Sequence, residues 1–303
     1  MKSILIIGGT GSLGHALVSR LYNTYNIFII SRDEDKQYKM KKQYPKISYF
    51  LCDIRIQNRI ESLIIKINPD IIIHASALKH IDICEENIDE CILTNIIGTQ
   101  NVVNSIVNNL YRLKLETFVF ISTDKATSPV NVYGMCKGIS EKIVCGIKIN
   151  NPKFIVVRYG NVLNSRGSLL PLFHEIGKDE KQDCFKVTNE NMTRFFLTLN
   201  QGIDLIMKSI EEGMSGDIFI PKTDSYRIMD IAEEFSKHYN KPIKIVGCRP
   251  GEKIHECLIN ESESLKCIEH DTYYIIKPYY IHDRPFEYKS NSNLKKFKIE
   301  SFI

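Results

Sequence analysis

The sequence predicts an α/β protein in which a doubly wound parallel sheet is covered by helices on both faces. Short apolar runs alternate with stretches of helical periodicity through the first half of the chain. The runs are apolar throughout, which is typical of parallel strands buried on both faces. After Gly160 the alternation weakens and loops rich in Asn, Gly and Pro appear. We therefore expect a smaller C-terminal α/β lobe that binds the substrate.

Strands are expected at residues 2–7, 27–30, 47–51, 71–74, 117–121 and 154–157. Helices are expected at 36–42, 55–67, 88–108, 132–149, 198–211 and 227–238, and the spacing of Leu13, Ala16, Leu17 and Leu21 indicates a first helix. We assign residues 1–163 to the sheet domain, with 192–222 returning to it. Residues 164–191 and 223–303 form the second lobe.

Composition narrows the classes of function. The 303 residues are 43% hydrophobic and 25% charged, as in an ordinary globular protein. A net charge of +4 with interspersed signs argues against a nucleic-acid partner. No apolar run reaches the length of a membrane span, and the N-terminus enters a strand without a signal peptide. Nine scattered cysteines without a Cys-x-x-Cys pair favour reduced thiols in the cytoplasm, and no metal-binding motif appears.

A glycine loop follows the first strand and contains a G-x-G-x-x-G match. Glycines there permit a tight turn and a close approach of the backbone to a pyrophosphate at a helix N-terminus. A match alone is weak, but its place between the first strand and the first helix strengthens it. The expected dinucleotide-binding residues are Gly8, Thr10, Gly11, Ser12, Leu13 and Gly14.

The ends of the second and third strands bear on the choice of cofactor. Ser31 is followed by Arg32, whose guanidinium suits a 2′-phosphate, so we favour NADP over NAD. The alternative is that Arg32 belongs to a solvated charged loop. Asp53, followed by Ile54, either accepts a hydrogen bond from the adenine amino group or caps the next helix.

Small residues after the fourth strand would let a dinucleotide cross the sheet, and we include Ala75, Ser76, Ala77 and Lys79 in its site. Asn95 is unusual in a helix that packs on a sheet. One interpretation is that Asn95 holds the helix or a water near the site, and on this basis we add it to the cofactor residues. The alternative is that Asn95 lies exposed. His74 and His80 are interpreted as structural.

Five proton-handling side chains follow the fifth strand: Thr123, Asp124, Lys125, Tyr133 and Lys137. Tyr133 and Lys137 lie four residues apart on one helix face. A phenol of pKa about 10 becomes a useful base when a nearby cation favours its ionised form. Lys137 is placed to supply that charge, and Thr123 to bind the same hydroxyl. The alternative is an ordinary surface Tyr/Lys pair.

At this point the chain resembles extended short-chain dehydrogenases/reductases, which have a Rossmann-type fold. More closely, it resembles C5-inverting UDP-N-acetylglucosamine 4,6-dehydratases of the CapD-like polysaccharide-biosynthesis group. The matching runs are residues 8–14, 31–34, 74–80, 122–126 with Pro129 and Asn131, 133–137, 158–162, 165–168, 192–196, 249–253 and 255–256. The Ser-Thr-Asp-Lys-Ala and Arg-Pro-Gly-Glu-Lys runs are the specific ones.

The resemblance implies an NADP domain, a nucleotide-sugar lobe and a three-stage reaction on UDP-N-acetylglucosamine. Tyr133, with Thr123 and Lys137, takes the proton of the 4-hydroxyl, Lys125 removes the C5 proton, and Asp124 assists the loss of water. NADP is tightly bound and recycled, and subunits form a homo-oligomer. The implied substrate-binding residues are Lys79, Asn161, Arg194, Arg249 and Glu252.

Two alternatives use the same cofactor loop. A nucleotide-sugar 4-epimerase or reductase would need Tyr133 and Lys137 but no Asp124-Lys125 pair, and a non-catalytic NADP-binding regulator would need none of them. No residue excludes UDP-glucose as the substrate. On an extended strand, Asp124 and Lys125 would point to opposite sides, which weakens an ion pair between them. Lys125 would also need a lowered pKa to act as a base.

Overall fold

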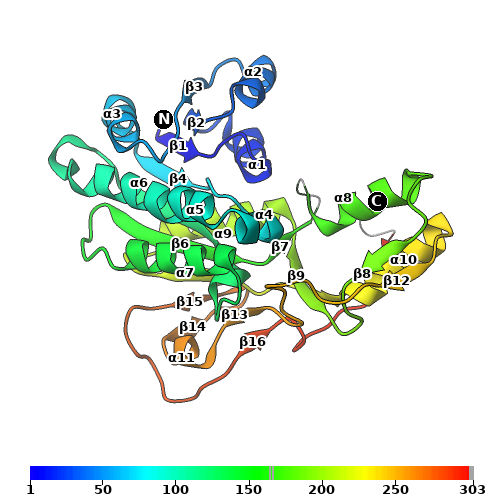
Figure 1. Ribbon diagram of the computed structural model, residues 1–303. Coiled ribbons are helices and arrows are strands. Elements are labelled where there is room, and N and C mark those ends of the chain that lie inside the picture. The colour runs from blue at the N-terminus through cyan, green and yellow to red at the C-terminus, as the bar shows by residue number, and fades with distance from the viewer. Residues whose placement is uncertain (164, 166, 300–303) are drawn as a thin grey trace.

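The computed structural model describes residues 1–163, 165 and 167–299 (Figure 1). Its centre is a nine-stranded sheet with the order β14-β15-β10-β6-β5-β4-β1-β2-β3. The predicted α/β class with a doubly wound sheet is therefore confirmed. The predicted second lobe and the 165–168 run include Asn164, Arg166 and residues 300–303, which lie outside the described residues.

Seven neighbouring strands of this sheet are parallel, and two antiparallel strands extend it. The parallel strands are β1 (Ser3–Ile7), β2 (Asn26–Ser31), β3 (Ser48–Leu51), β4 (Ile71–His74), β5 (Thr117–Thr123), β6 (Lys153–Tyr159) and β10 (Ile218–Pro221). β15 (Tyr273–Ile276) and β14 (Cys267–Glu269) complete it. Strands β1 to β3 are added toward one edge of the sheet and β4 to β6 toward the other, so the strand order reverses between β1 and β4. Ligands of such folds bind at the carboxyl ends of the strands at this point.

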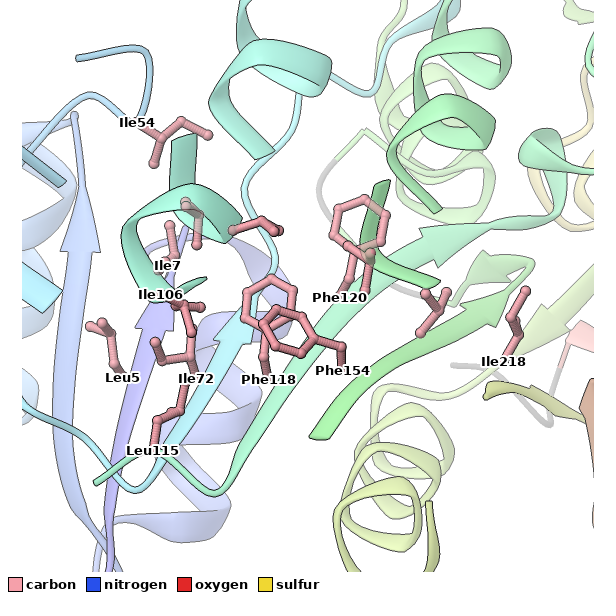
Figure 2. Close-up of a cluster of buried hydrophobic side chains, with 14 of the residues drawn as sticks. Leu5, Ile7, Ile54, Ile72, Ile106, Leu115, Phe118, Phe120, Phe154 and Ile218 are labelled. Carbon is pink, nitrogen blue, oxygen red and sulfur yellow. The ribbon is translucent and has the colours of Figure 1, made fainter. Parts of the chain in front are cut away.

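Helices cover both faces of the sheet (Figure 1). Along β1, Leu5 and Ile7 face one apolar cluster and Ile4 and Ile6 face the other, so successive side chains enter different cores. Figure 2 shows the first cluster. Its helices are α3 (Gln57–Ile67), α6 (Gly98–Val107) and α7 (Val132–Cys145), and those of the second are α1 (Ser12–Leu21), α2 (Glu34–Gln43) and α9 (Leu199–Glu212).

The helix predicted at 88–108 is interrupted. α5 (Ile88–Cys91) leads into a π-helical segment, Ile92–Ile97, and then into α6. α4 (Ile81–Glu86), which precedes it, was not predicted. The wider π turn changes which side chains face the edge of the sheet. The sequence does not reveal this turn, because its apolar residues are read with the 3.6-residue period of an α-helix. Within the described ranges, every helix is too short or too polar to span a bilayer.

Smaller elements lie beside the main sheet, and several of them pack around a third apolar cluster that includes Phe173 and Phe235. They are β7 (Asn161–Val162), β9 (Thr193–Leu197) and β11 (Ser225–Arg227) in one sheet, β8 (Phe185–Val187) with β12 (Ile243–Ile245), β13 (Cys257–Ile259) with β16 (Tyr288–Lys289), and helices α8 (Leu169–Lys178), α10 (Ile228–Tyr239) and α11 (Glu261–Ser264). The division into two lobes stays a prediction. From 192–222, α9 and β10 join the main sheet, as do β14 and β15 from 223–303.

Candidate active site

The glycine loop turns directly out of β1 and brings its backbone close to the strand beside it. Gly8 has φ +84°, and a Cβ there would lie 2.7 Å from the backbone N of Ser76. A Cβ at Gly14 would lie 2.1 Å from the carbonyl oxygen of Gly9. Any side chain at these two positions would therefore displace the backbone. The loop and the start of α1 are built for a ligand that approaches main-chain N–H groups.

A cleft of about 820 Å³ opens at the carboxyl ends of the parallel strands. It is lined by all the predicted cofactor residues except Asn95, namely Gly8, Thr10, Gly11, Ser12, Leu13, Gly14, Ser31, Arg32, Asp53, Ile54, Ala75, Ser76, Ala77, Lys79, Tyr133 and Lys137. Thr123, Lys125 and Asn161 line the same cleft. The predicted cofactor residues other than Asn95 and most of the predicted catalytic residues thus line one cavity.

Three charged residues line the cleft where β2 and β3 end, and they differ in what they contact. Asp53 accepts hydrogen bonds from the Arg55 backbone and guanidinium, at 3.0 Å and 2.6 Å, so much of its carboxylate is already engaged. Asp33 caps α2 and pairs with Lys36. Arg32 forms no ion pair with any described residue and lines the cleft. Arg32 is therefore available for an anionic ligand.

Asn95 is buried and faces a backbone segment rather than the cleft. Its Oδ1 accepts from the Leu78 N–H at 2.8 Å, and its Nδ2 donates to the Leu78 carbonyl at 2.9 Å. Asn95 is thus not part of the cleft lining, its place among the cofactor residues stays a prediction, and the exposed alternative is wrong. The preceding residue, Thr94, lines the cleft together with Ser122. Both hydroxyls are buried without a partner among the described residues, as a site for a polar ligand requires.

The predicted catalytic cluster begins where β5 ends. The chain turns at once into a 3₁₀ turn, Asp124–Ala126, in which the Lys125 N–H donates to the Thr123 hydroxyl. This turn brings the Lys125 Nζ to 3.0 Å from the Asp124 Oδ1, while the Thr123 hydroxyl donates to the same oxygen at 2.9 Å. The expectation that Asp124 and Lys125 diverge is wrong, because the extended strand ends at Thr123 and both residues lie in the 3₁₀ turn that follows.

Tyr133 lies in the first turn of α7 and is buried. Burial raises the pKa of Tyr133 to about 12, although the Lys125 cation and the Thr123 hydroxyl act in the opposite direction. The predicted role of Lys137 as the cation that favours the phenolate stays a prediction. The Lys137 ammonium donates to the Ile121 carbonyl at 2.5 Å and lies 3.8 Å from the centre of the Phe120 ring.

The pKa values of the two lysines are shifted in opposite directions. Burial lowers the pKa of Lys137 to about 7, against smaller opposing effects that include Glu141. Burial also acts to lower the pKa of Lys125, but the carboxylates of Asp124 and Glu256 outweigh it and raise that pKa above its ordinary value. The sequence-based requirement of a lowered pKa at Lys125 is therefore not met in this state of the site.

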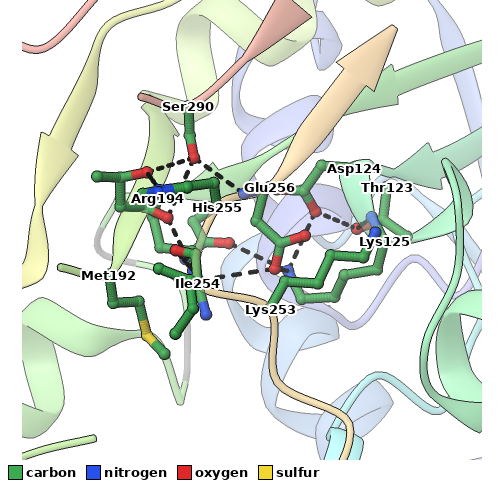
Figure 3. A network of polar contacts seen from close by, with 12 residues as sticks. Thr123, Asp124, Lys125, Met192, Arg194, Lys253, Ile254, His255, Glu256 and Ser290 are labelled. Atoms are coloured by element: carbon green, nitrogen blue, oxygen red, sulfur yellow. Dashed lines mark hydrogen bonds and ion pairs between the residues drawn. The ribbon is translucent and has the colours of Figure 1, made fainter. Parts of the chain in front are cut away.

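Sequence reasoning assigned no role to Glu256, which lies just before β13 and is almost fully buried. Its Oε1 is 3.6 Å from the Lys125 Nζ and 3.7 Å from the Arg194 Nε (Figure 3). Arg194 also donates to the backbone carbonyls of Thr193 and Ile254. A carboxylate ahead of the apolar run 257–259 is the one sequence signal that this residue faces something charged.

The remaining predicted substrate residues lie outside the cleft lining. Arg249 is exposed in the loop after β12, and its N–H donates to the Glu252 carboxylate at 3.0 Å. Gly251 of this loop accepts a hydrogen bond from the Asn131 Nδ2 at 2.7 Å. The Asn131 Oδ1 accepts from the Gly134 N–H and caps α7. One amide therefore ties the Arg249 loop to the helix that carries Tyr133.

The architecture and the motifs agree with comparisons to known proteins. A polysaccharide biosynthesis protein family matches residues 4–278. A Campylobacter jejuni protein named UDP-N-acetylglucosamine 4,6-dehydratase (inverting) is 38% identical over 288 residues, 91% of this chain and 83% of the relative. A Rickettsia bellii protein named UDP-glucose 4-epimerase is 37% identical over 289 residues, 91% and 82% of the two chains.

Among solved structures, that of Pen from Bacillus thuringiensis superposes with a TM-score of 0.89 at 33% identity. The match covers 99% of this chain and 95% of that one. The similarity therefore extends through both the sheet and the smaller elements beside it. The chain belongs to the polysaccharide biosynthesis protein family, as its glycine loop, its Thr123–Lys137 cluster and its matched length together require.

Proposed function

We propose that the protein is a UDP-N-acetylglucosamine 4,6-dehydratase that inverts C5, a hydro-lyase that makes a 2-acetamido-2,6-dideoxy-4-hexulose for glycan synthesis. The observation that carries this proposal is the Asp124–Lys125 pair, 3.0 Å apart in the cluster that holds Tyr133. An oxidation at C4 alone needs one base, whereas an elimination needs a second base and an acid. The 38% identical relative has the corresponding name.

In the first stage Tyr133 takes the proton of the 4-hydroxyl, with the Thr123 hydroxyl and the Lys125 cation favouring its ionised form. NADP, when bound, supplies the hydride acceptor for C4 and returns hydride to C6. Lys137, fixed by the Ile121 carbonyl, lies at the cofactor side of the cleft. The ketone formed at C4 makes the C5 proton acidic.

The second stage needs a neutral Lys125 and a protonated Asp124. Transfer of one proton from the Lys125 Nζ to the Asp124 Oδ1 along their 3.0 Å hydrogen bond yields both at once, with no change in net charge. Burial favours this neutral pair, since both side chains are largely removed from solvent. Lys125 then takes the C5 proton, and Asp124 gives its proton to the 6-hydroxyl, which leaves as water. When hydride returns to C6, a proton is added to C5 from the opposite face, and this inverts C5.

The cofactor is NADP rather than NAD. Arg32 lines the cleft at the end of β2, and its guanidinium suits a 2′-phosphate. The backbone cradle at Gly8 and Gly14 fits a pyrophosphate. Because the cofactor is regenerated in each cycle, it is held tightly and not consumed.

The substrate lies between the cofactor and the second lobe. Arg194 and Arg249 supply guanidinium groups for its pyrophosphate, and Glu252 suits the uridine ribose hydroxyls. Asn161, 3.4 Å from the Lys125 Nζ, and Lys79 contact the sugar or phosphate. Arg249 and Glu252 would reach the substrate by a movement of their exposed loop.

The enzyme works as a cytoplasmic homo-oligomer. Large apolar side chains are exposed on α4, α5, the π-helical segment and α7, and we place the contact between subunits there. They are Ile83, Ile88, Ile92, Leu93, Ile97, Met135 and Ile139. The nine free cysteines, eight of which are buried or half-buried, fit a reducing compartment.

The reaction is tested by incubating the protein with UDP-N-acetylglucosamine in deuterated water, followed by NMR and mass spectrometry. Loss of one water with deuterium at C5 and inverted configuration is the expected result. A 4-epimer without deuterium at C5 would instead favour the epimerase, whose name the 37% identical relative carries. Lys125→Ala should abolish water loss and leave NADP bound, and normal product from that variant would remove Lys125 as the base.

A further inference from the structure

Glu256 is the charged group of the cluster that the proposed reaction leaves without a role. It reaches the site from the segment before β13, far from Lys125 in the sequence, and only about 2% of its surface is exposed. Its backbone N–H donates to the Ser290 hydroxyl at 2.9 Å, which fixes where its side chain starts. A buried carboxylate is costly unless a cation compensates it.

The Lys125 ammonium lies between two carboxylates, with the Asp124 Oδ1 at 3.0 Å and the Glu256 Oε1 at 3.6 Å (Figure 3). The other oxygen of each, Asp124 Oδ2 and Glu256 Oε2, is buried without a partner among the described residues. Both carboxylates therefore depend on few cations for compensation. Lys125 is the cation closest to both the Asp124 and the Glu256 carboxylates.

We propose that Glu256 is a positioning residue that holds the Lys125 ammonium against Asp124 and keeps it protonated while no substrate is bound. This inference rests on the dehydratase function proposed above, in which Lys125 must later become neutral. Glu256 therefore sets the free-energy cost of the Lys125-to-Asp124 proton transfer. It does so from outside the reacting atoms, through its charge.

Other charged groups around Glu256 modulate this effect and do not replace it. The Arg194 Nε shares the Glu256 Oε1 with Lys125. The Arg194 Nη1 donates to two backbone carbonyls, so the guanidinium stays in place if Glu256 is changed. The titratable and charged groups that interact with Glu256 or its Lys125 partner are Asp124 and Lys125 from the 3₁₀ turn, Tyr133 from α7, Arg194 from β9, and Lys253 from its own segment.

The test is Glu256→Gln, which keeps the shape of the side chain and removes its charge. A carboxylate within about 4–6 Å of a lysine raises its pKa by about one to three units. The Lys125 titration midpoint should fall by that amount, measured by NMR on protein labelled at the lysine ε-carbon, with Lys125→Ala assigning the signal. The acid limb of the pH profile for water loss should move to lower pH by a similar amount.

Two further measurements separate a charge effect from damage to the fold. Oxidation at C4, followed by nicotinamide absorbance in a single turnover, should stay within about twofold of wild type, as should KM. Glu256→Asp, which keeps the charge, should give a midpoint nearer to wild type. Glu269→Gln removes an exposed carboxylate paired with Lys222 and should change none of these quantities.

An unchanged Lys125 midpoint in Glu256→Gln would overturn the proposal, and so would an equal loss of C4 oxidation and water loss. The NMR titration needs no substrate. A wild-type protein that never eliminates water, but whose Lys125 midpoint falls in Glu256→Gln, would therefore refute the proposed function while supporting the role of Glu256 in setting the charge.

Discussion

Arg158 on β6 holds α7 to the sheet through a largely buried ion cluster, and its removal gives the sharpest stability prediction. Its guanidinium makes four hydrogen bonds of 2.6–3.0 Å to the carboxylates of Glu141 on α7 and Glu263 on α11. A fifth, of 2.9 Å, goes to the Leu258 carbonyl. Glu141 lies one turn beyond Lys137, so this cluster anchors the helix that carries the cofactor-side residues.

Arg158→Met leaves the Glu141 carboxylate buried and unpaired, and Glu263 partly so. Removing one partner of a buried pair costs about 3–5 kcal/mol. We expect that loss in the free energy of unfolding, measured by urea denaturation near neutral pH. The loss should shrink at acid pH, because an unpaired buried Glu141 has a raised pKa and becomes neutral as protons bind.

Two matched variants test this reasoning. Arg158→Met combined with Glu141→Gln should recover part of the loss, because the stranded charge is gone. Lys222→Met breaks the largely exposed Lys222–Glu269 pair, also 2.6 Å long, and should cost less than about 1 kcal/mol. A loss of less than about 1 kcal/mol in Arg158→Met itself would refute the assignment of a stabilising anchor to this cluster.

Three other predictions concern single side chains at the cleft. Arg32→Ser should weaken NADP binding about tenfold or more and leave NAD binding nearly unchanged, as measured by calorimetry, because only the 2′-phosphate contact is lost; equal losses for both cofactors would contradict this. Burial lowers the pKa of Lys137 to about 7, so the folded state binds fewer protons there than the unfolded state, and wild type should gain stability relative to Lys137→Met as the pH rises from about 7 to about 10 in urea titrations. Parallel stability curves for the two proteins would count against a buried neutral amine. Asn131→Asp keeps the cap of α7 but places a carboxylate against the Gly251 carbonyl, so KM for the nucleotide-sugar should rise about tenfold with unchanged helix content by circular dichroism. An unchanged KM would show that the Arg249 loop does not depend on this amide.

The parts of the fold that the sequence predicts well carry local signals. The β1–glycine loop–α1 unit combines an apolar run, a turn motif and a helical stripe, and each lies within a few residues of the next. The strands of the parallel sheet are apolar at nearly every position, so their existence is plain and only their ends shift by a few residues. The end of β5 is an example, because Ser122 and Thr123 continue the strand past the predicted Ile121.

The candidate site is predicted less completely, because its geometry depends on contacts between distant segments. Nothing in the local sequence places Glu256 beside Lys125, and the 3₁₀ turn at Asp124 lacks a Gly or Pro signal. Asn95 was recognised as an unusual residue, but the π-helical segment turns it to the Leu78 backbone and presents Thr94 to the cleft. Periodicity finds residues that face a sheet, and it cannot tell which neighbour reaches the site.

The protonation states in the cluster give a constraint on the proposed reaction that the sequence did not contain. The Lys125 cation acts to lower the pKa of Tyr133 and so favours its phenolate. The first stage therefore works best with Lys125 charged, whereas the second stage needs it neutral. Once Tyr133 has taken the proton of the 4-hydroxyl, the phenolate no longer needs the cation. The Lys125 proton can then move to Asp124, 3.0 Å away, and the same lysine serves both stages in sequence.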